Sequence, residues 1–305
     1  MGKYVVKRVL RGIVTLLGIS IVVFVLTHIF GDPAIMLLPE DATKETLWFT
    51  RESLGLNDPL IIQFKNFALN ALKGDFGPSI HQMESSRALL LRALPATGVL
   101  AAAALAVGGT IGVTIGILAS MKPRSWLDNV VSTISMGGVS TPEFWVALLL
   151  IWVVAVQFGL LPTSGYGQWQ HLILPAVVLS IRPTGRIAQV TRSSMLDEMS
   201  RQYTVTAYAK GLARRQVIRR HVLKNAGIGI VTMVGIEVAD LLSGTIIVET
   251  IFAWPGVGFQ AKRAFFSSDF PLIQTVVLWA ALITVTMNLL VDLTYGWLNP
   301  RIRYA

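Results

Sequence analysis

The chain has 305 residues, 53% of them hydrophobic and 14% charged, and its formal net charge is +9. Soluble domains usually hold about 25% charged residues, so this composition excludes an ordinary soluble domain and predicts one membrane bundle. The absence of cysteine excludes disulfides, thiolate metal sites and thiol chemistry. The positive charge lies between apolar runs, as in cytoplasmic loops of membrane proteins, which disfavours nucleic acid as its partner.

Residues 1–30 predict a first membrane span. The basic start "MGKYVVKRVLRG" precedes "IVTLLGISIVVFVLTHIF", an apolar stretch of about 18 residues. A cleaved signal peptide is the alternative, but "THIFGDP" offers no small-x-small cleavage site and the stretch is long for a signal core. We therefore expect an uncleaved transmembrane helix with its N-terminus in the cytoplasm.

Residues 31–92 are the most polar part of the chain and predict a loop on the periplasmic or extracellular side. Acidic residues are frequent here, and Pro and Gly punctuate "LGLNDPL" and "GDFGPS". The loop also has apolar surface to pack, so we expect a folded segment rather than a linker. Its aromatic residues are Trp48, Phe49, Phe64, Phe67 and Phe76.

A second span is expected from about residue 95 to 120. Gly108, Gly112 and Gly116 recur every four residues and share one face of this helix. Such spacing of small residues lets two helices approach closely in lipid. The alternative is that the glycines are merely tolerated.

The third and fourth spans depend on weaker signals. The third, from about residue 129 to 158, contains Thr141-Pro142, where we expect a kink or an interruption. The fourth, "HLILPAVVLSI", is too short to cross alone. However, residues 182–224 hold ten Lys and Arg whereas 159–171 hold none, so sorting of positive charge predicts a crossing between them.

A fifth span from about residue 228 to 252 and a sixth from about 272 to 297 complete the prediction. The expected fold class is an all-α integral membrane protein with six transmembrane helices and both termini in the cytoplasm. Five of these helices form a core at 93–297, followed by a cytoplasmic tail at 298–305. In this orientation 18 of the 26 Lys and Arg residues lie inside.

The sequence contains no recognisable catalytic or metal-binding constellation. It has no G-x-x-x-x-G-K-[ST] phosphate loop and no G-x-S-x-G nucleophile elbow. Its four histidines, His28, His81, His171 and His221, show no metal-ligand spacing. We therefore expect a conduit or scaffold without catalytic residues or a metal site, and not an enzyme.

Residues 203–226, "YTVTAYAKGLARRQVIRRHVLKNA", are dense in Lys and Arg and hold no acidic side chain. The apolar periodicity shifts at Gly211, so we expect two short helices joined at this glycine. The segment could lie on anionic lipid, contact nucleic acid, or dock into a groove of a partner protein with acidic rims. Its small residues and glycine break favour docking, because sorting of charge does not explain them.

This segment resembles the EAA loop of ABC importer permeases, in the variant of the dipeptide/oligopeptide/nickel group. The matching residues are Tyr203, Thr206, Ala207, Ala209, Lys210, Gly211, Leu212, Val217, His221, Leu223, Lys224, Asn225 and Ala226. Elsewhere "GDP", "LGLNDPL", "GDFGPS", "ETIFAWPGVG" with a later "DFPL", "NLLVDLTYG" and "NPRIRY" also look like that group, in the same order. The resemblance thus covers nearly the whole chain and is strongest to the B-type subunit of dipeptide permeases.

Three departures from the pattern of that group stand out. Phe30 precedes "GDP" where proline is usual, and "ESSRALLLRALPAT" lacks a Pro-Val pair. Glu237 and Asp240 occupy positions where uncharged residues are usual. The first two put little in doubt, whereas the acidic pair bears on the substrate.

The resemblance implies the type I, binding-protein-dependent ABC importer fold in the cytoplasmic membrane of a prokaryote. The implied partners are a second homologous permease, two cytoplasmic ABC ATPase subunits and an extracytoplasmic solute-binding protein. ATP and magnesium would bind to the ATPases, and this chain would bind no cofactor. The implied cargo is di- or oligopeptides, with nickel chelates or glutathione as alternatives. An autonomous channel or a proton-coupled carrier is the alternative of a different class.

The resemblance also implies which residues couple the chain to the ATPases. The candidates are Tyr203, Thr206, Ala207, Tyr208, Lys210, Gly211, Leu212, Arg214, Arg215, Arg219 and His221. Among them Ala207, Gly211 and Leu212 would form the seat of the docking element, where bulk would clash. The arginines would supply orientation and charge matching.

Two further groups of candidates lie beyond this segment. Glu237 and Asp240 are three residues apart and share a face of the fifth span. They either pair with the cytoplasmic arginines or cap a neighbouring helix, or they line a translocation path that favours cationic cargo. By resemblance, Trp254, Pro255, Gly256 and Gly258 of "AWPGVG" are assigned to a periplasmic gate. We expect Asp292, in the sixth span, to be a structural hydrogen-bond acceptor.

Overall fold

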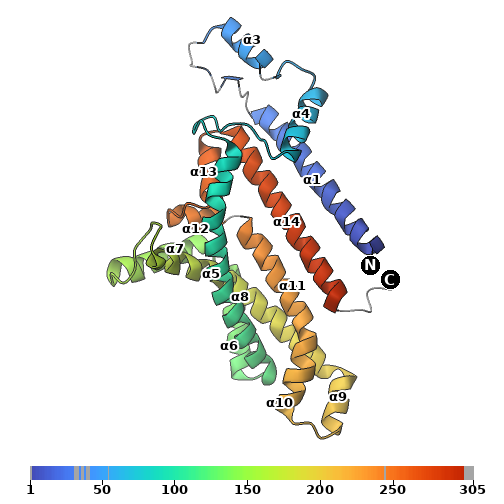
Figure 1. Ribbon diagram of the computed structural model, residues 1–305. Coiled ribbons are helices and arrows are strands. Elements are labelled where there is room, and N and C mark those ends of the chain that lie inside the picture. Colours follow the sequence, from blue (N-terminus) through green and yellow to red (C-terminus); the bar gives the residue numbers. More distant parts are fainter. Residues whose placement is uncertain are drawn as a thin grey trace.

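The regular structure of the described residues is helical. The computed structural model describes residues 2–30, 34–35, 38, 42–53, 55–243 and 245–298, and this part of the chain holds no β-strand beyond one isolated bridge between Pro78 and Ser85. Helices satisfy their backbone polar groups within one segment, as lipid requires. The all-α prediction is confirmed over these ranges (Figure 1).

Four helical stretches are long and apolar enough to cross a membrane, or up to five if one bent pair is counted as a single span. The four are Val5–Ile29, Ser86–Met121, Arg214–Leu242 and Phe270–Thr294. The predicted six spans are therefore not confirmed by length and composition. The helix that contains "HLILPAVVLSI" does not qualify, and its polar and basic residues, including Arg182 and Arg186, explain why.

The first helix lies beside the last. α1, Gly2–Phe30, packs along α14, Phe270–Leu298, at one side of the bundle (Figure 1). Arg8 Nε lies 3.0 Å from Asp292 Oδ2 near one end of the pair, which confirms Asp292 as a hydrogen-bond acceptor. Near the other end the Gln274 amide donates to the Thr27 hydroxyl at 2.9 Å.

The polar segment after α1 contains α3, Lys44–Ser53, and α4, Leu60–Leu72. The Phe64 and Phe67 rings of α4 lie 5.4 and 5.7 Å from the Phe24 ring of α1. Trp48 and Phe49 of α3 contact each other, but they remain 55% and 66% exposed. The expectation of packed aromatic rings therefore holds for α4, whereas the two rings of α3 stay on the surface.

The centre of the molecule is the pair formed by α5, Ser86–Met121, and α8, Trp169–Ser200. A Cβ atom added at Gly108, Gly112 or Gly116 would lie 2.9, 2.8 or 2.7 Å from a carbonyl oxygen of α8. Real Cβ atoms do not approach so closely, so the helices can only meet here through glycine. The predicted close approach along this face is confirmed.

The third predicted span is broken at the expected place. α6, Trp126–Ser140, is followed by α7, Glu143–Leu150, and by the π-helical segment η1, Ile151–Gln157. The two parts are bent by 99° at Thr141-Pro142. Proline cannot donate a backbone hydrogen bond and disfavours a helical residue before it, so it ends α6. α7 consequently projects to the side of the bundle (Figure 1).

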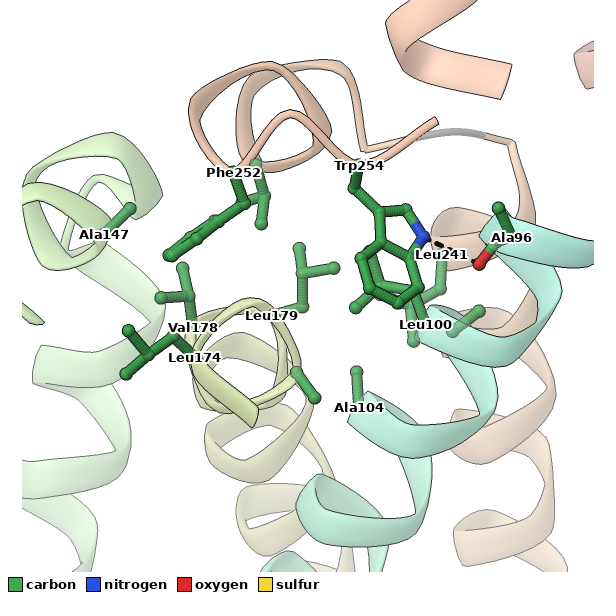
Figure 2. Packing of buried hydrophobic residues seen from close by; sticks show 13 residues of the cluster. Ala96, Leu100, Ala104, Ala147, Leu174, Val178, Leu179, Leu241, Phe252 and Trp254 are labelled. Atoms are coloured by element: carbon green, nitrogen blue, oxygen red, sulfur yellow. Dashed lines mark hydrogen bonds between the residues drawn. The ribbon is translucent and has the colours of Figure 1, made fainter. Parts of the chain in front are cut away.

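The C-terminal half continues with α11, Leu223–Leu242, α12, Ile246–Ile251, and α13, Val257–Phe266. The predicted fifth span thus ends earlier than expected, before Ser243, and α12 is a separate short helix. α12 and the loop after it cover the largest buried core, which also draws on α5, α7, α8 and α11. Phe252 and Trp254 enter this core from above α5 and α8 (Figure 2).

Candidate coupling surface and charged hollow

Residues 202–226 form two short helices and the start of a long one. α9, Gln202–Ala209, and α10, Arg214–Val217, are separated by a turn in which Gly211 has a φ of +79°. Most side chains with a Cβ atom are strained in this left-handed conformation, so the turn favours glycine, with Asn or Asp as the least costly replacements. The chain then passes through η2, Ile218–Val222, into α11. The predicted pair of helices joined at Gly211 is confirmed.

The inner face of this segment packs within the chain itself. Ala207, Val217 and Val222 are 6%, 0% and 0% exposed, and they surround the fully buried Met195 of α8. Leu212 is half-buried at the border of the same cluster. Ala207 and Leu212 therefore shape the segment from inside, and bulk at Ala207 would first disturb the chain's own packing.

The outer face of the segment is open and basic. Its exposed candidate residues are Tyr203, Thr206, Tyr208, Lys210, Gly211, Arg214, Arg215 and Arg219. His221 is half-buried. Since residues 203–226 contain no acidic side chain, the charges that this segment itself contributes to the face are all positive. We call it the coupling surface.

Hydrogen bonds anchor the coupling surface to the two central helices. Arg214 Nη2 donates to the Met121 carbonyl at 2.5 Å, at the end of α5, where the helix dipole favours a cation. The Tyr203 hydroxyl donates to Glu198 Oε2 of α8 at 2.5 Å and accepts from the Asn225 amide at 2.9 Å. Partial burial and the Glu198 carboxylate raise the pKa of Tyr203, so the hydroxyl remains a donor.

A second anchor lies next to this surface. Arg192 of α8 makes two bonds to the Asp128 carboxylate at the start of α6, one of them 2.8 Å from Nη2 to Oδ2. Asp128 also accepts from the Arg124 backbone N–H at 2.8 Å and is 1% exposed. Bidentate geometry of this kind fixes both orientation and distance. It ties α6 to α8 beside the coupling surface.

A charged hollow of about 430 Å³ lies between α7, α8, α11 and α12. Arg186 Nη1 of α8 is 3.2 Å from Glu237 Oε1 and 3.1 Å from Asp240 Oδ2, both on α11. On the same wall Arg182 Nη1 is 3.2 Å from Glu143 Oε1 of α7. The hollow is therefore lined by three carboxylates and two guanidinium groups.

The two acidic residues differ in their exposure. The Glu237 side chain is 3% exposed, whereas that of Asp240 is 59% exposed, and both line the hollow. They share a helix face, as predicted, and both contact Arg186 and line the hollow. Their place in a translocation path stays a prediction. Arg182, Arg186 and Glu143 were not among the candidates. The sequence did hold a signal for them, because Arg182 and Arg186 stand four residues apart directly after an apolar run.

The "AWPGVG" residues occupy a largely buried loop between α12 and α13 and the first turn of α13. Trp254 is 3% exposed, and its indole N–H donates to the Ala96 carbonyl of α5 at 2.9 Å (Figure 2). The Tyr166 ring packs edge-on against it at 4.8 Å. Pro255 is half-buried. Trp254 thus fixes the loop to the N-terminal part of α5.

Glu249 is the polar centre of this loop, and it was missed among the candidate residues. It is fully buried, accepts from the Thr97 hydroxyl at 2.8 Å, and accepts from the Phe259 backbone N–H at 2.9 Å. A Cβ atom at Gly256 would collide with Glu249, and one at Gly258 would lie 2.8 Å from the Ile246 backbone. Both glycines therefore allow the loop to close around the carboxylate.

The described side chains of these sites offer charge and hydrogen-bonding groups. Within the described ranges no three His, Cys, Asp or Glu residues are grouped so that they could hold a metal ion. The hollow offers guanidinium groups for a carboxylate and carboxylates for an ammonium group. No side chain in it pairs a nucleophile with a base.

Comparison with known proteins places the chain among membrane components of transport systems. Residues 112–304 match the family described as binding-protein-dependent transport system inner membrane component, and residues 1–100 match the corresponding N-terminal family. The glutathione transport system permease protein GsiC of Salmonella choleraesuis (strain SC-B67) is 38% identical over 306 residues, which cover 100% of both chains. The probable peptide ABC transporter permease protein y4tP of Sinorhizobium fredii is 37% identical over 313 residues, again covering 100% of both.

Solved structures with a similar fold are transmembrane components of ABC transporters. The MetNI methionine ABC transporter, in an inward-facing conformation, superposes with a TM-score of 0.58 at 18% identity, over 69% of this chain and 96% of the other. An amino acid ABC transporter gives a TM-score of 0.55 at 20% identity, over 68% and 92%. At these identities the similarity concerns the fold alone.

Proposed function

This chain belongs to the inner-membrane components of binding-protein-dependent transport systems, and we propose that it is a permease subunit of an ATP-driven importer of peptides. One observation carries the proposal: the coupling surface is exposed and basic on its outer face while its inner face is anchored to α5 and α8. A helix that only binds lipid does not need to be anchored to α5 and α8. A surface that transmits force to the membrane helices must be anchored to them.

The proposed assembly has four further components. A second, homologous permease completes the membrane part, and two cytoplasmic ABC ATPase subunits bind ATP and magnesium. An extracytoplasmic solute-binding protein delivers the cargo. This chain binds no cofactor in the assembly and hydrolyses nothing itself. The full-length match to a family named for binding-protein-dependent transport supports this composition.

The proposed topology has six spans with both termini in the cytoplasm of a prokaryotic cell. The N-terminal helix is residues 1–30, the extracytoplasmic loop is 31–92, the transmembrane core is 93–297, and the tail is 298–305. In this arrangement α8 is the span that its own hydropathy does not reveal, because it carries Arg182 and Arg186. Carboxylates pair both arginines, and the glycine face of α5 packs closely against α8. A reporter fused after Lys73 should read periplasmic, and a cytoplasmic signal would overturn the topology.

The coupling mechanism follows from the stiffness of helices. When ATP draws the two ATPases together, they pull the coupling surfaces of the two permeases inward. Arg214, Arg215 and Arg219 match acidic rims on the ATPase groove, and Gly211 gives the turn its shape. Because the segment is anchored to α5 and α8, its movement rocks these helices and switches the access of the hollow.

The proposed cargo is di- or oligopeptides, with glutathione or nickel chelates carried by the same machinery as the alternatives. The two relatives above are named for glutathione and for peptides, and glutathione is itself a small peptide. A peptide carries an ammonium group and a carboxylate, which the carboxylates and guanidinium groups of the hollow could each meet. On this proposal Glu237 and Asp240 line the path, and Trp254, Pro255, Gly256 and Gly258 close it on the outside.

Reconstitution into liposomes tests this proposal against an autonomous channel or a proton-coupled carrier. The chain should move a labelled dipeptide only together with the second permease, the ATPases, the binding protein and ATP. Liposomes with the full assembly and a non-hydrolysable ATP analogue are the control. Uptake by the chain alone, with or without a proton gradient, would refute the importer.

A further inference from the structure

A groove runs between α1 and α14, away from the coupling surface and the charged hollow. Its first part is a hollow of about 300 Å³ between Arg8 and Ile19 on α1 and Ala281 and Asp292 on α14. A second hollow of about 440 Å³ continues further along the same helix pair. Thr15 and Ile19 line both hollows, so the two adjoin.

The first part of the groove is polar and carries an excess of positive charge. Arg8 and Arg11 line it together with Asp292 and the Asn288 amide. Asp292 lies 3.0 Å from Arg8. The Arg11 side chain makes no ion pair with any described residue and is exposed. One guanidinium group therefore faces this hollow without an acidic partner in the described part of the chain.

The second part of the groove is apolar. Gly18, Val22 and Leu26 of α1 and Ile273 and Val277 of α14 line most of it. At a rise of about 1.5 Å per residue, Leu26 lies about 17 Å along α1 from Thr15. One leaflet of a bilayer has a hydrocarbon thickness of about 15 Å, half of the whole core. The apolar part thus has the length of one leaflet.

We propose that this groove binds one anionic phospholipid. The phosphodiester lies at Arg11 beside Arg8 and Asn288, and an acyl chain follows Gly18, Val22 and Leu26. A free phosphate would leave the apolar part empty, and a neutral lipid would leave the Arg11 charge unmatched. The positive charge and the leaflet-length apolar part occur in this order along one helix pair. The site rests on the membrane position of α1 and α14 and is independent of the transport role.

Native mass spectrometry of the purified full-length chain, with any subunits that copurify, tests the site. The protein is titrated with phosphatidylglycerol and with phosphatidylcholine of the same acyl chains. We expect phosphatidylglycerol to bind about fivefold more tightly, the effect of one basic residue at a membrane surface. Arg11→Gln should abolish this preference. Lys7→Gln removes the same charge from an exposed position of α1 outside the groove, so it should retain most of the preference.

A second variant tests the apolar part without changing charge. A Cβ atom at Gly18 would meet no atom within 4 Å, so Gly18→Leu should fold normally and fill the groove. We expect it to weaken both lipids at least about fivefold, and glycerol phosphate should not compete with phosphatidylglycerol. Equal binding of the two lipids, equal loss in Arg11→Gln and Lys7→Gln, or unchanged binding in Gly18→Leu would each overturn the lipid site.

Discussion

Arg186 makes two carboxylates tolerable in a membrane protein. Glu237 is buried, and an unpaired carboxylate at membrane depth costs several kcal/mol. One guanidinium nitrogen lies within 3.2 Å of Glu237 and 3.1 Å of Asp240. Since Asp240 remains exposed, the pairing with Glu237 carries most of the energetic weight and the pairing with Asp240 carries little.

Removing the Arg186 charge should destabilise the protein through Glu237. We expect Arg186→Gln to lower the free energy of unfolding by about 3 kcal/mol, because it leaves a buried carboxylate without its partner. Adding Glu237→Gln should restore most of that loss. Asp240→Asn is the control and should change stability by less than about 1 kcal/mol. Thermal unfolding of the purified complexes compares the wild type with the three variants. An Arg186→Gln variant with unchanged stability would contradict this account.

Gly211 combines a strained turn with an exposed position, and a substitution can separate the two. Its φ of +79° suits Asn or Gly, and a Cβ atom there would meet nothing within 4 Å. We expect Gly211→Asp to insert normally but to lower peptide-dependent uptake more than about tenfold, because a negative charge opposes the acidic rims. Asn is nearly the same size as Asp but neutral, so Gly211→Asn should lose less of the uptake than Gly211→Asp.

Gly159 provides the matched control for the Gly211 prediction. It also has a positive φ, of +61°, and open space around a Cβ atom, but it lies between η1 and α8. Gly159→Asp should leave both uptake and ATP hydrolysis unchanged. Normal transport by Gly211→Asp, or an equal loss in Gly159→Asp, would refute docking at the coupling surface.

At the scale of elements, the pair α5 and α8 depends on three glycines. Gly112→Ala should lower the unfolding free energy by about 1–3 kcal/mol, because the new methyl group would lie 2.8 Å from the Thr184 carbonyl oxygen. Gly109, on another face of α5, has nothing within 4 Å, so Gly109→Ala should be neutral within about 0.5 kcal/mol. Thermal unfolding compares the two, and equal effects would show that the glycine face is not what holds the helices together.

The elements that sequence predicts well are those set by near neighbours. The break at Thr141-Pro142, the turn at Gly211 and the glycine face of α5 all follow from local spacing. The pairing of Arg186 with Glu237 does not, because 51 residues separate them and their contact depends on how α8 and α11 are rotated and shifted against each other. The end of α11 and the separate α12 were missed for a related reason, since apolar residues continue across the break.

The same limit applies to the candidate site. Sequence similarity selected the residues of the coupling segment but not the direction in which each one faces. Ala207 belongs to the buried cluster and Tyr208, its neighbour, to the exposed face. Glu249 was passed over because an acidic residue in an apolar stretch gives no indication of its partners. Thr97 and the Phe259 backbone, which bind it, lie on two other elements.

At the scale of the whole molecule, α8 links the three candidate sites. Its C-terminal end anchors the coupling surface through Glu198, its middle supplies Arg182 and Arg186 to the hollow, and its first turns pack beneath the loop that holds Trp254. Figure 1 shows α8 and α11 running from the coupling segment toward α12. A rigid rotation of this unit would therefore alter the hollow and the loop together.

If the unit rotates in this way, binding of ATP to the ATPases should alter how accessible the hollow is from outside the membrane. Because the chain has no cysteine, Ser243→Cys places a single thiol on the wall of the hollow. In the reconstituted assembly its labelling by an impermeant maleimide should change by about fivefold or more between the nucleotide-free and the ATP-trapped state. Ser193→Cys makes the same substitution at an exposed position of α8 outside the hollow, and its labelling should change less than about twofold. Equal labelling of Ser243→Cys in both states would place the hollow outside the transport path, since a path with alternating access cannot keep the same exposure in both.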